Sequence, residues 1–528
     1  MTSATCRHSS SLTLVGNALS VLIAATERAH RGLPTTIINP GGPLGGYFAG
    51  ASVQGRRVDC GMVLYEFSSF SEPSQSPRLD SYDPMVRNDV GRFCSVIRRY
   101  IHGMQATRPI SSPRMWVDGK ILPDMMLANG MSALHHLSNS AAIHRELSVI
   151  SQAIRPDTAI WHPANKRAWP LDGSPAPDWH LTQPHAAFDA DTLSRNIHGQ
   201  TLHNTLFAPF AHQVLNRDAS DILALYHRLP WLPLYWPQTL LDILSDHHNT
   251  SQLPATVFNY PVHGTISALC QQLALMVRSD HRICLIDDQI HHIQRTPDEF
   301  IIRTAQHGDI HTERLGWALT PAHGLRVTAQ FAAPESGDRL PLLIGFCSIP
   351  TDQVRNVISV LHMVSGDTGI YRVTNSTACG APTDPGVMHL VIEANPNRFS
   401  IQHPDINLHD DAAVMAAMLH DLSLTGVINA HVRVKNFEVK RFSGALPLPT
   451  SRSVTAFLEN RARLQSVLTG VELLAASAGP FAFGLSDQIV QGLQLAQRAS
   501  KHSMLDQGEL LAVPATSTPC AAAHSLFQ

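Results

Sequence analysis

The sequence of 528 residues lacks several features that would assign it to a class at once. No apolar run reaches the roughly 18 residues that a membrane-spanning helix needs, because polar or charged residues interrupt every candidate. The 39 Lys and Arg nearly balance the 42 Asp and Glu, and no long run of one sign occurs. Nucleic-acid platforms and binders of anionic membranes need clustered basic residues, so this balance argues against both. We therefore expect a soluble, cytoplasmic protein with no transmembrane segment and no nucleic-acid partner.

Signatures of metal sites, disulfide scaffolds and hydrolase nucleophiles are missing as well. The 30 histidines are framed by no H-E-x-x-H or C-x-x-C spacing, so no metal site is expected. The eight cysteines are scattered without short regular spacing, which fits a reducing compartment better than a disulfide scaffold. No G-x-S-x-G and no Cys/His signature is present, and the catalytic residues are left unassigned.

The segment LTLVGNALSVLIAATERAHRG, residues 12–32, allows three interpretations: an export signal, a buried structural helix or a nucleotide-binding turn. Arg7 and His8 precede an apolar stretch at 12–25, which has about the length of the apolar part of an export signal. No small-x-small cleavage site follows, and the chain continues into a charged patch at 27–31. The export signal is therefore disfavoured.

The same segment has the order of a βαβ unit. It predicts a strand at 11–15, a glycine turn, a helix at 19–31 and a second strand at 35–39. In such a unit the helix buries its apolar face on a parallel sheet.

The turn of this unit carries a degenerate dinucleotide-binding motif. In G-x-G-x-x-G the glycines make the turn, admit the pyrophosphate and allow close packing of the helix. Here the three positions are Gly16, Ala18 and Val21, and the acidic residue expected at the end of the second strand is Asn39. Asparagine accepts a hydrogen bond without the assistance of charge. Taken alone, the segment favours a buried structural helix over a phosphate cradle.

The stretch after the second strand changes this balance. P-G-G-P-L-G-G-Y occupies residues 40–47, and a V-D-x-G pattern follows at 58–61. The order strand, glycine turn, helix, strand, L-G-G, hairpin, V-D-x-G resembles the flavoprotein superfamily of amine oxidases, protoporphyrinogen oxidases, carotenoid desaturases and UDP-galactopyranose mutases. The resemblance implies that Leu44, Gly45 and Gly46 bring backbone amides against FAD, where a Cβ would hold the backbone away.

Four later stretches follow the order of that superfamily. They are WVDGKILP at 116–123, FNYPVHGTISALCQQLA at 258–274, the run from ICLIDDQ to ALTP at 283–321, and LLAASAGPFAFGLSDQIVQGLQLA at 473–496. The first is closest to the hairpin of the mutase-like branch. The resemblance implies that a backbone group near Ile290 meets the adenine. It also implies that the N-terminus of the last helix, around Asp487 and Gln488, faces the cofactor, as a helix dipole favours.

FAD is therefore the expected cofactor. The residues assigned to it by the resemblance are Gly16, Ala18, Leu19, Asn39, Leu44, Gly45, Gly46, Ile290, Asp487 and Gln488. One departure concerns the mutase-like closing motif, which has Gly-Arg where this chain has Ala476-Ser477, so the arginine expected to neutralise the pyrophosphate is missing. Binding of FAD is then expected to depend on Gly45, Gly46 and the closing turn.

The resemblance implies an α/β fold in which a Rossmann-like FAD-binding domain is interleaved with a mixed α+β substrate domain. The FAD-binding domain is predicted at 1–70, 256–330 and 455–500, the substrate domain at 71–255 and 331–454, and a flexible tail at 501–528. Within the substrate domain, residues 83–250 are predicted to be mostly helical and residues 340–450 to contain strands, with a helix at 408–426 ending at a glycine.

Two places are candidates for contact with substrate or flavin. The aromatic stretch HRLPWLPLYWPQTLL, residues 227–241, contains Tyr235 and Trp236 and is a candidate lining for an apolar substrate tunnel. The favoured alternative is that it forms the core of the inserted domain. Phe258 and Tyr260 are candidates to face the flavin, with a packing role as the alternative.

The function expected is that of an amine oxidase-like, FAD-dependent oxidoreductase acting on a small organic or biosynthetic intermediate by hydride transfer to flavin. A flavoprotein fold without cofactor, serving as a binding or scaffold subunit, is the alternative. A third possibility is a non-redox, mutase-like flavoenzyme, although Arg228 has no convincing second partner for clamping a sugar nucleotide. The sequence does not indicate the oligomeric state.

Overall fold

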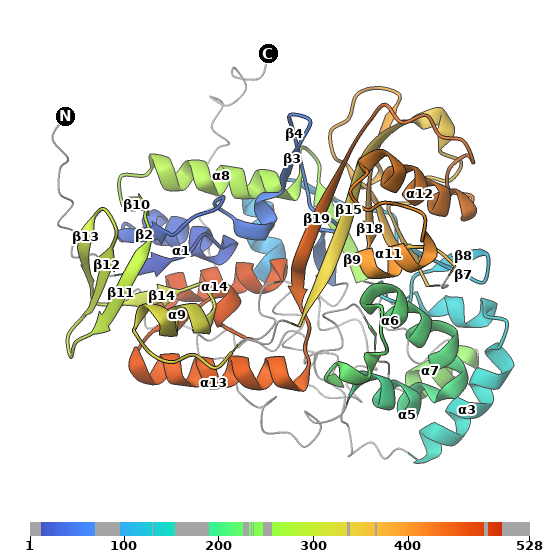
Figure 1. Ribbon diagram of the computed structural model, residues 1–528, viewed down its shortest axis with the longest axis horizontal. Helices are drawn as coiled ribbons and strands as arrows, with labels where there is room; N and C mark the ends of the chain where they lie inside the picture. The colour runs from blue at the N-terminus through green and yellow to red at the C-terminus, as the bar shows by residue number, and fades with distance from the viewer. Residues whose placement is uncertain are drawn as a thin grey trace.

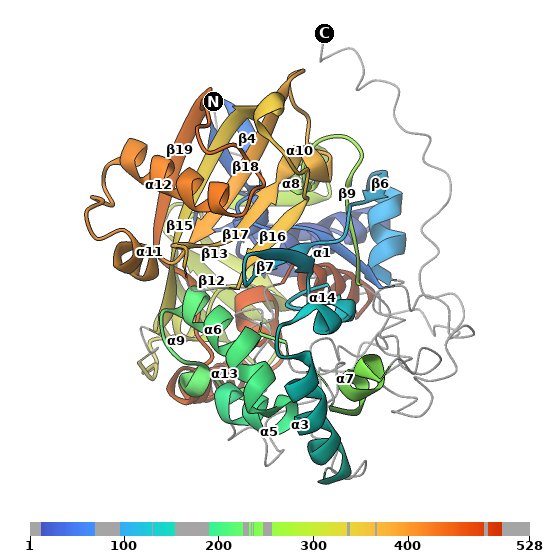
Figure 2. The ribbon, with the colours of Figure 1, turned by 90° about the vertical axis from the view of Figure 1, so that its right-hand side faces the viewer.

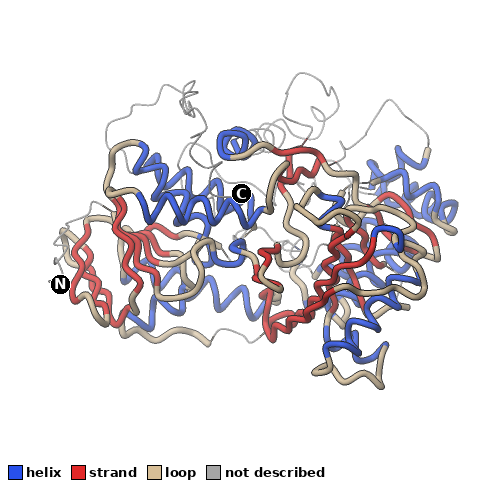
Figure 3. Tube along the Cα trace, turned by 90° about the horizontal axis from the view of Figure 1, so that it is seen from above, coloured by secondary structure: helices blue, strands red, loops and turns tan. Residues whose placement is uncertain are grey.

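The computed structural model describes residues 12–68, 96–128, 130–153, 189–224, 232–233, 235, 237–245, 256–334, 338–364, 367–479 and 484–498. Trp236 and the tail predicted at 501–528 lie outside these residues. Most of the strands form two groups, one toward each end of the long axis of the molecule (Figure 1, Figure 3). No helix in the described part of the chain is long and apolar enough to cross a membrane.

The first group is a five-stranded parallel sheet. It consists of β10 (Ile283–Asp287), β2 (Thr35–Asn39), β1 (Thr13–Val15), β14 (Leu315–Trp317) and β20 (Glu472–Leu473), in that order. Every neighbouring pair is parallel. Counted by their appearance in the chain, the strands lie in the order 3-2-1-4-5, which is that of the dinucleotide-binding fold. The predicted Rossmann-like sheet is confirmed.

Helices cover this sheet because its strands are apolar on both sides. All residues of β1 and β2 are buried, as parallel strands between helices require. The helices around it are α1 (Leu19–His30), α8 (Ile266–Ser279), α9 (Pro321–Val327), α13 (Ser451–Val467) and α14 (Leu485–Arg498). Figure 1 shows α8 and α13 on opposite sides of α1 and α14.

The packing of α1 explains one departure from the glycine motif. Val21, at the third motif position, is completely buried and belongs to the core around α1. The tight approach of α1 to α14 occurs instead at Gly492, where a Cβ would lie 2.7 Å from Ile23 Cβ and 2.8 Å from the Ser20 carbonyl oxygen. The structure therefore places the small residue on α14, and α1 presents an apolar side chain.

Shorter sheets extend this half of the molecule. The antiparallel sheet β11 (Ile290–Arg295), β12 (Phe300–Thr304) and β13 (Gly308–Thr312) connects β10 to β14. A hairpin of β3 (Ala51–Val53) and β4 (Arg56–Val58) follows the turn η1 (Gly46–Ala49). A third sheet has the order β5 (Tyr65–Ser68), β9 (Thr256–Pro261), β6 (Thr107–Pro109).

The second group is a seven-stranded mixed sheet. It consists of β19 (Asn436–Pro447), β15 (Arg339–Pro350), β18 (Val387–Ala394), β17 (Ile370–Asn375), β16 (Val360–Met363), β7 (Arg114–Val117) and β8 (Lys120–Pro123), in that order. The strands expected within 340–450 are present, and WVDGKILP forms the β7–β8 hairpin. Its turn residues Asp118 and Gly119 both have positive φ, 49° and 73°, as a tight right-twisted hairpin requires.

Both faces of the seven-stranded sheet are covered. Along β15, Ile344 and Phe346 enter one core whereas Leu343 and Cys347 enter the other, because successive side chains point to opposite faces. One face carries α11 (Pro396–Gln402) and α12 (Asp411–Leu424), whose buried residues share a core with Leu343 and Cys347, and α12 ends before Gly426 as predicted. Cys379, at the end of α10 (Ser376–Cys379), belongs instead to the core around α1. Figure 2 shows α11 and α12 beside the strands of this sheet. The helices from the segment 83–250, described next, lie below the strands in that view.

The segment predicted to be mostly helical contains helices and also strands. Residues 96–104 are helical, and the further helices are η4 (Met131–His136), α3 (Ser140–Ala153), α5 (Ala190–Leu202), the π-helix η8 (His203–Phe207), α6 (Ala208–Leu215), η9 (Ala219–Asp221) and α7 (Pro237–Leu244). The two remaining short turns are η11 (Thr351–Gln353) and η12 (Ala475–Ser477). The strand β6 departs from that prediction, since three residues are too few to give a periodic pattern.

Candidate nucleotide-binding site

The carboxyl ends of β1, β2 and β10 meet at one edge of the parallel sheet, and we call residues 16–19, 39–46 and 287–289 at this place the cradle edge. In open parallel sheets, ligands bind at the carboxyl ends of the strands. Most of the residues that the sequence assigns to FAD lie here, on segments far apart in the chain. The exceptions are Ile290, Asp487 and Gln488.

The turn from β1 into α1 is held open by Gly16. Its φ of 123° lies in the region that favours glycine, and a Cβ would stand 3.1 Å from Ala318 Cβ. Ala18 is the N-cap of α1 and its side chain offers no capping hydrogen bond, whereas the Ser20 N–H in the first turn donates to Gln488 Oε1. The first turn of α1 contains no acidic residue. A helix N-terminus without a carboxylate in its first turn favours an anionic ligand.

The L-G-G stretch packs directly on this turn. The Gly45 N–H donates to the Asn17 carbonyl over 2.7 Å, and Ala18 and Gly45 form a parallel β-bridge. Gly45 has a φ of 99°, and a Cβ there would lie 2.6 Å from Cys270 Cβ. Leu44 is buried in the core around α1 and anchors the loop. The glycine requirement inferred from the resemblance therefore has a local cause, independent of any ligand.

Gly46 has more space than Gly45. Its φ is 57°, and the nearest heavy atom to an added Cβ is Ala18 Cα at 3.7 Å. A larger side chain at 46 would extend beside the start of α1 without displacing a core residue.

Asn39 ends β2 and is tied into the cradle edge at both ends of its amide. Its Oδ1 accepts from the Gly41 N–H over 3.1 Å, and its Nδ2 donates to the Gly42 carbonyl over 3.3 Å. The same Nδ2 donates to Asp287 Oδ1 over 2.8 Å. The side chain that the resemblance places against FAD thus also organises the loop that follows it.

The last helix reaches α1 through a glutamine. Gln488, in the first turn of α14, is buried, and its Oε1 accepts from the Ser20 N–H over 3.3 Å. Asp487 lies in the same first turn. The N-termini of α1 and α14 are therefore neighbours; that the N-terminus of α14 faces the cofactor stays a prediction.

Ser477, which stands where the mutase-like motif has an arginine, has a structural role. Ser477 is completely buried, and its Oγ accepts from the Leu474 N–H over 3.0 Å. The same hydroxyl contacts the Trp317 carbonyl at the end of β14. Ser477 therefore joins β20 to β14 and faces the protein interior, where an arginine would have no room to extend.

Ile290 lies in the core more than at the surface. It begins β11, pairs with Thr304, and is packed with Val15 and Ile38 under the ends of β1 and β2. Two aspartates end the strand before it: Asp287 is exposed, and Asp288, directly after β10, is buried. The residues of this segment that reach the cradle edge are thus 287–289.

The V-D-x-G pattern connects the cradle to the other half of the molecule. Asp59 accepts from the Tyr260 hydroxyl over 2.6 Å and from the N–H groups of Ile266 and Ser267 at the start of α8. Burial raises the pKa of Asp59, and these hydrogen bonds oppose that shift. Gly61 has a φ of 79°, and a Cβ there would stand 3.1 Å from the Glu393 carboxylate.

Glu393 belongs to a buried ion pair that meets this segment. It pairs with Arg372, both side chains being 2% exposed. Its Oε1 accepts from the Met62 N–H over 3.1 Å, and the Tyr371 hydroxyl donates to Oε2 over 3.1 Å. The pair therefore joins the seven-stranded sheet to the residues that follow the cradle.

The aromatic candidates prove to be buried. Phe258 and Tyr260 on β9 lie in the core around α1, and the Tyr260 hydroxyl is engaged by Asp59. Tyr235 is 4% exposed, and its hydroxyl donates to the Met125 carbonyl. These contacts fit the packing role that the sequence offers as the alternative.

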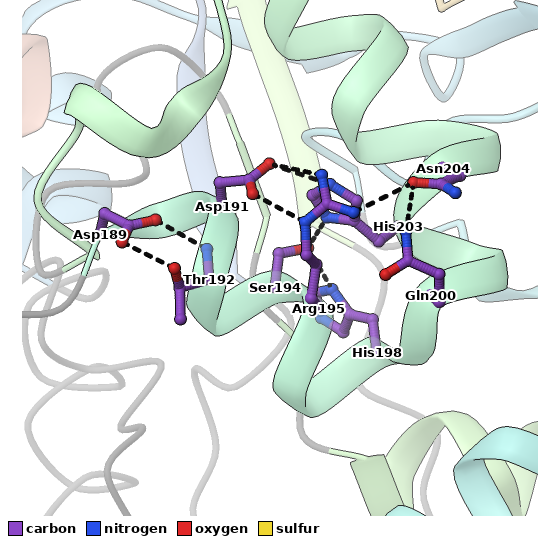
Figure 4. A network of polar contacts seen from close by, with 9 residues as sticks. All are labelled: Asp189, Asp191, Thr192, Ser194, Arg195, His198, Gln200, His203 and Asn204. Carbon is purple, nitrogen blue, oxygen red and sulfur yellow. Dashed lines mark hydrogen bonds and ion pairs between the residues drawn. The ribbon is translucent and has the colours of Figure 1, made fainter.

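A polar network beside Tyr235 was not anticipated from the sequence (Figure 4). The Tyr235 N–H donates to His198 Nε2 over 2.8 Å, so His198 carries its proton on Nδ1 and donates to Ser194 Oγ over 3.0 Å. Ser194 then donates to His203 Nδ1 over 2.9 Å, and His203 Nε2 faces Asp191 at 3.0 Å. The helical spacing of 191, 194 and 198 was the available signal.

This network contains the residue types of a hydrolase triad, but its serine and histidines are buried in the protein interior. Ser194 is 3% exposed and lies between two histidines. Burial lowers the pKa of His203, although the Asp191 charge opposes this, so the ring stays neutral near pH 7. We interpret the network as a structural brace of the kinked helix α5.

Comparison with known proteins supports the fold. The chain is similar to a reduced UDP-galactopyranose mutase (TM-score 0.61, 12% identity, 93% of this chain and 94% of that one). It is also similar to a putative protoporphyrinogen oxidase from Exiguobacterium sp. 255-15 (TM-score 0.57, 14% identity, 93% of this chain and 98% of that one). A third similar structure is cyclohexylamine oxidase from Brevibacterium oxydans (TM-score 0.57, 12% identity, 93% of this chain and 99% of that one). No protein-family model and no curated protein matches the sequence.

These structures represent three of the protein classes named by the resemblance, and each is covered over nearly its whole length. The chain therefore has the fold of the amine oxidase, protoporphyrinogen oxidase and UDP-galactopyranose mutase structures. The fold inferred from the order of motifs is confirmed.

The residues present fit the adenosine diphosphate part of FAD. The cradle edge offers a helix N-terminus without a first-turn carboxylate, backbone in left-handed conformations that only glycine adopts easily, and polar side chains from β2 and β10. The N–H groups of Gly16, Gly45 and Gly46 donate to protein carbonyls, so these glycines would serve a pyrophosphate by leaving room for it beside the backbone.

Proposed function

We propose that the protein is an FAD-dependent oxidoreductase of the amine oxidase-like type, acting on a small organic or biosynthetic intermediate. The observation that carries the proposal is the cradle edge, in which Gly45 packs on the start of α1 at the carboxyl ends of a 3-2-1-4-5 parallel sheet. Bound FAD would supply the acceptor for a hydride from a substrate C–H bond.

The chain itself would bind and orient the cofactor. The start of α1 would direct its positive dipole end toward the pyrophosphate. The Gly45–Gly46 turn, whose N–H groups donate to the Asn17 and Pro43 carbonyls, would let the pyrophosphate approach because it carries no Cβ. The N-terminus of α14, beside that of α1, would direct its positive dipole end toward the flavin. The discontinuous domain division predicted from the sequence remains part of this proposal, with 1–70, 256–330 and 455–500 as the cofactor domain.

The test is the visible spectrum of the purified full-length protein before and after incubation with FAD. We expect the absorption bands of bound flavin, and we expect anaerobic cyclohexylamine or putrescine to bleach them. A protein that gains no flavin bands would contradict the proposal and favour the scaffold alternative. Flavin that binds and stays oxidised with every amine would favour the mutase-like alternative. The similarity to UDP-galactopyranose mutase supports that alternative.

The cradle is tested by Gly46→Val. The valine side chain would occupy the space beside Ala18 Cα, and we expect loss of flavin retention. Gly55→Val is the matched control, because Gly55 also has positive φ, 78°, and no atom lies within 4 Å of an added Cβ. Both variants carry a similar backbone cost of about 1–2 kcal/mol. Equal flavin occupancy in the two variants would show that the cradle lies elsewhere.

A further inference from the structure

The cradle edge holds a carboxylate that the sequence did not single out. Asp287 is the last residue of β10 and lies in register with Asn39, the last residue of β2. It is exposed, and its Oδ1 accepts from Asn39 Nδ2 over 2.8 Å. Within the part of the chain that the structure describes, its Oδ2 has no hydrogen-bond partner. One carboxylate oxygen is therefore fixed by the protein, and the other faces solvent at the ligand-binding end of the sheet.

The backbone around Asp287 is fixed from both sides. The Asp288 N–H donates to the Asn39 carbonyl over 3.1 Å, and the Gln289 side chain donates to the Pro40 carbonyl. The Asp288 carboxylate accepts from the N–H groups of Gln306 and His307 over 2.8 and 3.1 Å. The loops after β2 and β10 are thus connected to each other and to the β12–β13 turn, so Asp287 is held in place before any ligand arrives.

The chemistry of the adenosine ribose explains what such a carboxylate would do. In dinucleotide-binding sheets of this order, an acidic residue at the end of the second strand accepts hydrogen bonds from the ribose hydroxyls. Here that position is the neutral Asn39, and the negative charge stands on the neighbouring strand. Asn39 Nδ2 donates to this carboxylate and orients it.

We propose that Asp287 is the acceptor for the ribose hydroxyls of the adenosine half of the cofactor, and that Asn39 is its positioning residue. The proposal rests on the proposed function and names the residue that replaces the missing acid of β2. A carboxylate at this place also repels a phosphate on the ribose 2′-oxygen. The site should therefore select adenosine ligands without a 2′-phosphate.

The experiment measures binding of FAD, ADP and adenosine 2′,5′-bisphosphate to the full chain by titration calorimetry. Wild type should bind ADP at least about tenfold more tightly than the 2′-phosphorylated probe. Asp287→Asn keeps the shape but removes the charge, and a charge-assisted hydrogen bond is worth about tenfold or more in affinity. We expect that loss for FAD and ADP, together with loss of discrimination against the 2′-phosphate. Asn39→Ala should give the same pattern with a smaller change.

Asp298→Asn is the matched control, because Asp298 is an exposed acid in the β11–β12 turn outside the cradle edge. Its affinities should equal those of wild type, and unfolding curves should show all variants folded. Equal FAD affinity in wild type and Asp287→Asn would overturn this inference and leave the proposed function intact. ADP binding that depends on Asp287 without any FAD binding would support the inference and overturn the proposed function. Binding of neither FAD nor ADP by wild type would overturn both.

Discussion

Polar residues at the cradle edge differ from those in the other half of the molecule in their exposure and in how fully protein groups satisfy them. At the cradle edge, Asp287 is exposed and Gly46 leaves open space beside α1. In the other half, Glu393 and Ser194 are 2–3% exposed and are engaged on several sides by protein groups. Polar groups that serve a ligand keep bonding capacity for it, whereas buried ones must be satisfied internally. Substitutions of exposed groups at the cradle edge should therefore affect ligand binding, and substitutions of buried polar groups should affect stability.

The largest effect is expected for Glu393→Ala. It leaves the Arg372 guanidinium buried without its carboxylate, which costs about 3–5 kcal/mol. Urea unfolding followed by circular dichroism measures this loss. Asp309→Ala removes the partner of Arg303 in an exposed pair, and its urea midpoint should stay close to that of wild type because solvent screens such a pair. Similar losses in the two variants would contradict the contrast between buried and exposed pairs.

A smaller loss is expected for Ser194→Ala. The hydroxyl serves both His198 and His203, and its removal leaves buried ring nitrogens unpaired at a cost of about 1–3 kcal/mol. Flavin retention should not change, because the network belongs to α5 and not to the cradle edge. Ser423→Ala, at a half-buried position of α12 whose hydroxyl donates only to the His420 carbonyl of the same helix, should stay within about 0.5 kcal/mol of wild type. If Ser194→Ala instead lost flavin without losing stability, the network would have a direct role in the site.

The smallest effect is expected for Asp288→Asn, and it depends on pH. Burial opposes the charge of Asp288, yet hydrogen bonds from His307 and from backbone N–H groups hold its pKa well below the ordinary value of 3.8. A carboxyl group with a depressed folded-state pKa stabilises the protein above its unfolded pKa, and this stabilisation is lost as the pH falls through the folded-state value. The difference in Tm between wild type and Asp288→Asn should therefore be largest at pH 5–7 and shrink below about pH 4.

Asp405→Asn, at an exposed loop position, serves as the comparison for that pH series. Its Tm should follow wild type at every pH. A difference between wild type and Asp288→Asn that grows toward low pH would contradict the assigned direction of the pKa shift.

Much of the cofactor half was predictable because its signals are local. The helix predicted at 19–31 is observed at Leu19–His30, and the strand predicted at 35–39 is observed at Thr35–Asn39. Periodicity and the glycine turn determine such elements within one short segment. The hairpin of WVDGKILP was likewise predictable, because its Asp-Gly turn favours positive φ.

The candidate site was predictable only in part, because its contacts join distant segments. Asp287 became a candidate once the sheet order placed β10 beside β2, 248 residues away in sequence. The network around Ser194 depends on the approach of Tyr235 to α5, which no local pattern encodes. The role of Ser477 likewise follows from the pairing of β20 with β14.

By itself, the sequence determined the βαβ start, the glycines of the cradle edge and the order of motifs, since turns and amphipathic periods depend on neighbouring residues. The tertiary structure decided which helix supplies the tight contact, where the carboxylate of the cradle edge lies, and which polar groups are satisfied inside the protein. Gly492 and Asp287 show the reason. A residue's space and its hydrogen-bond partners are set by whichever segment the fold brings beside it, and that neighbour can lie hundreds of residues away.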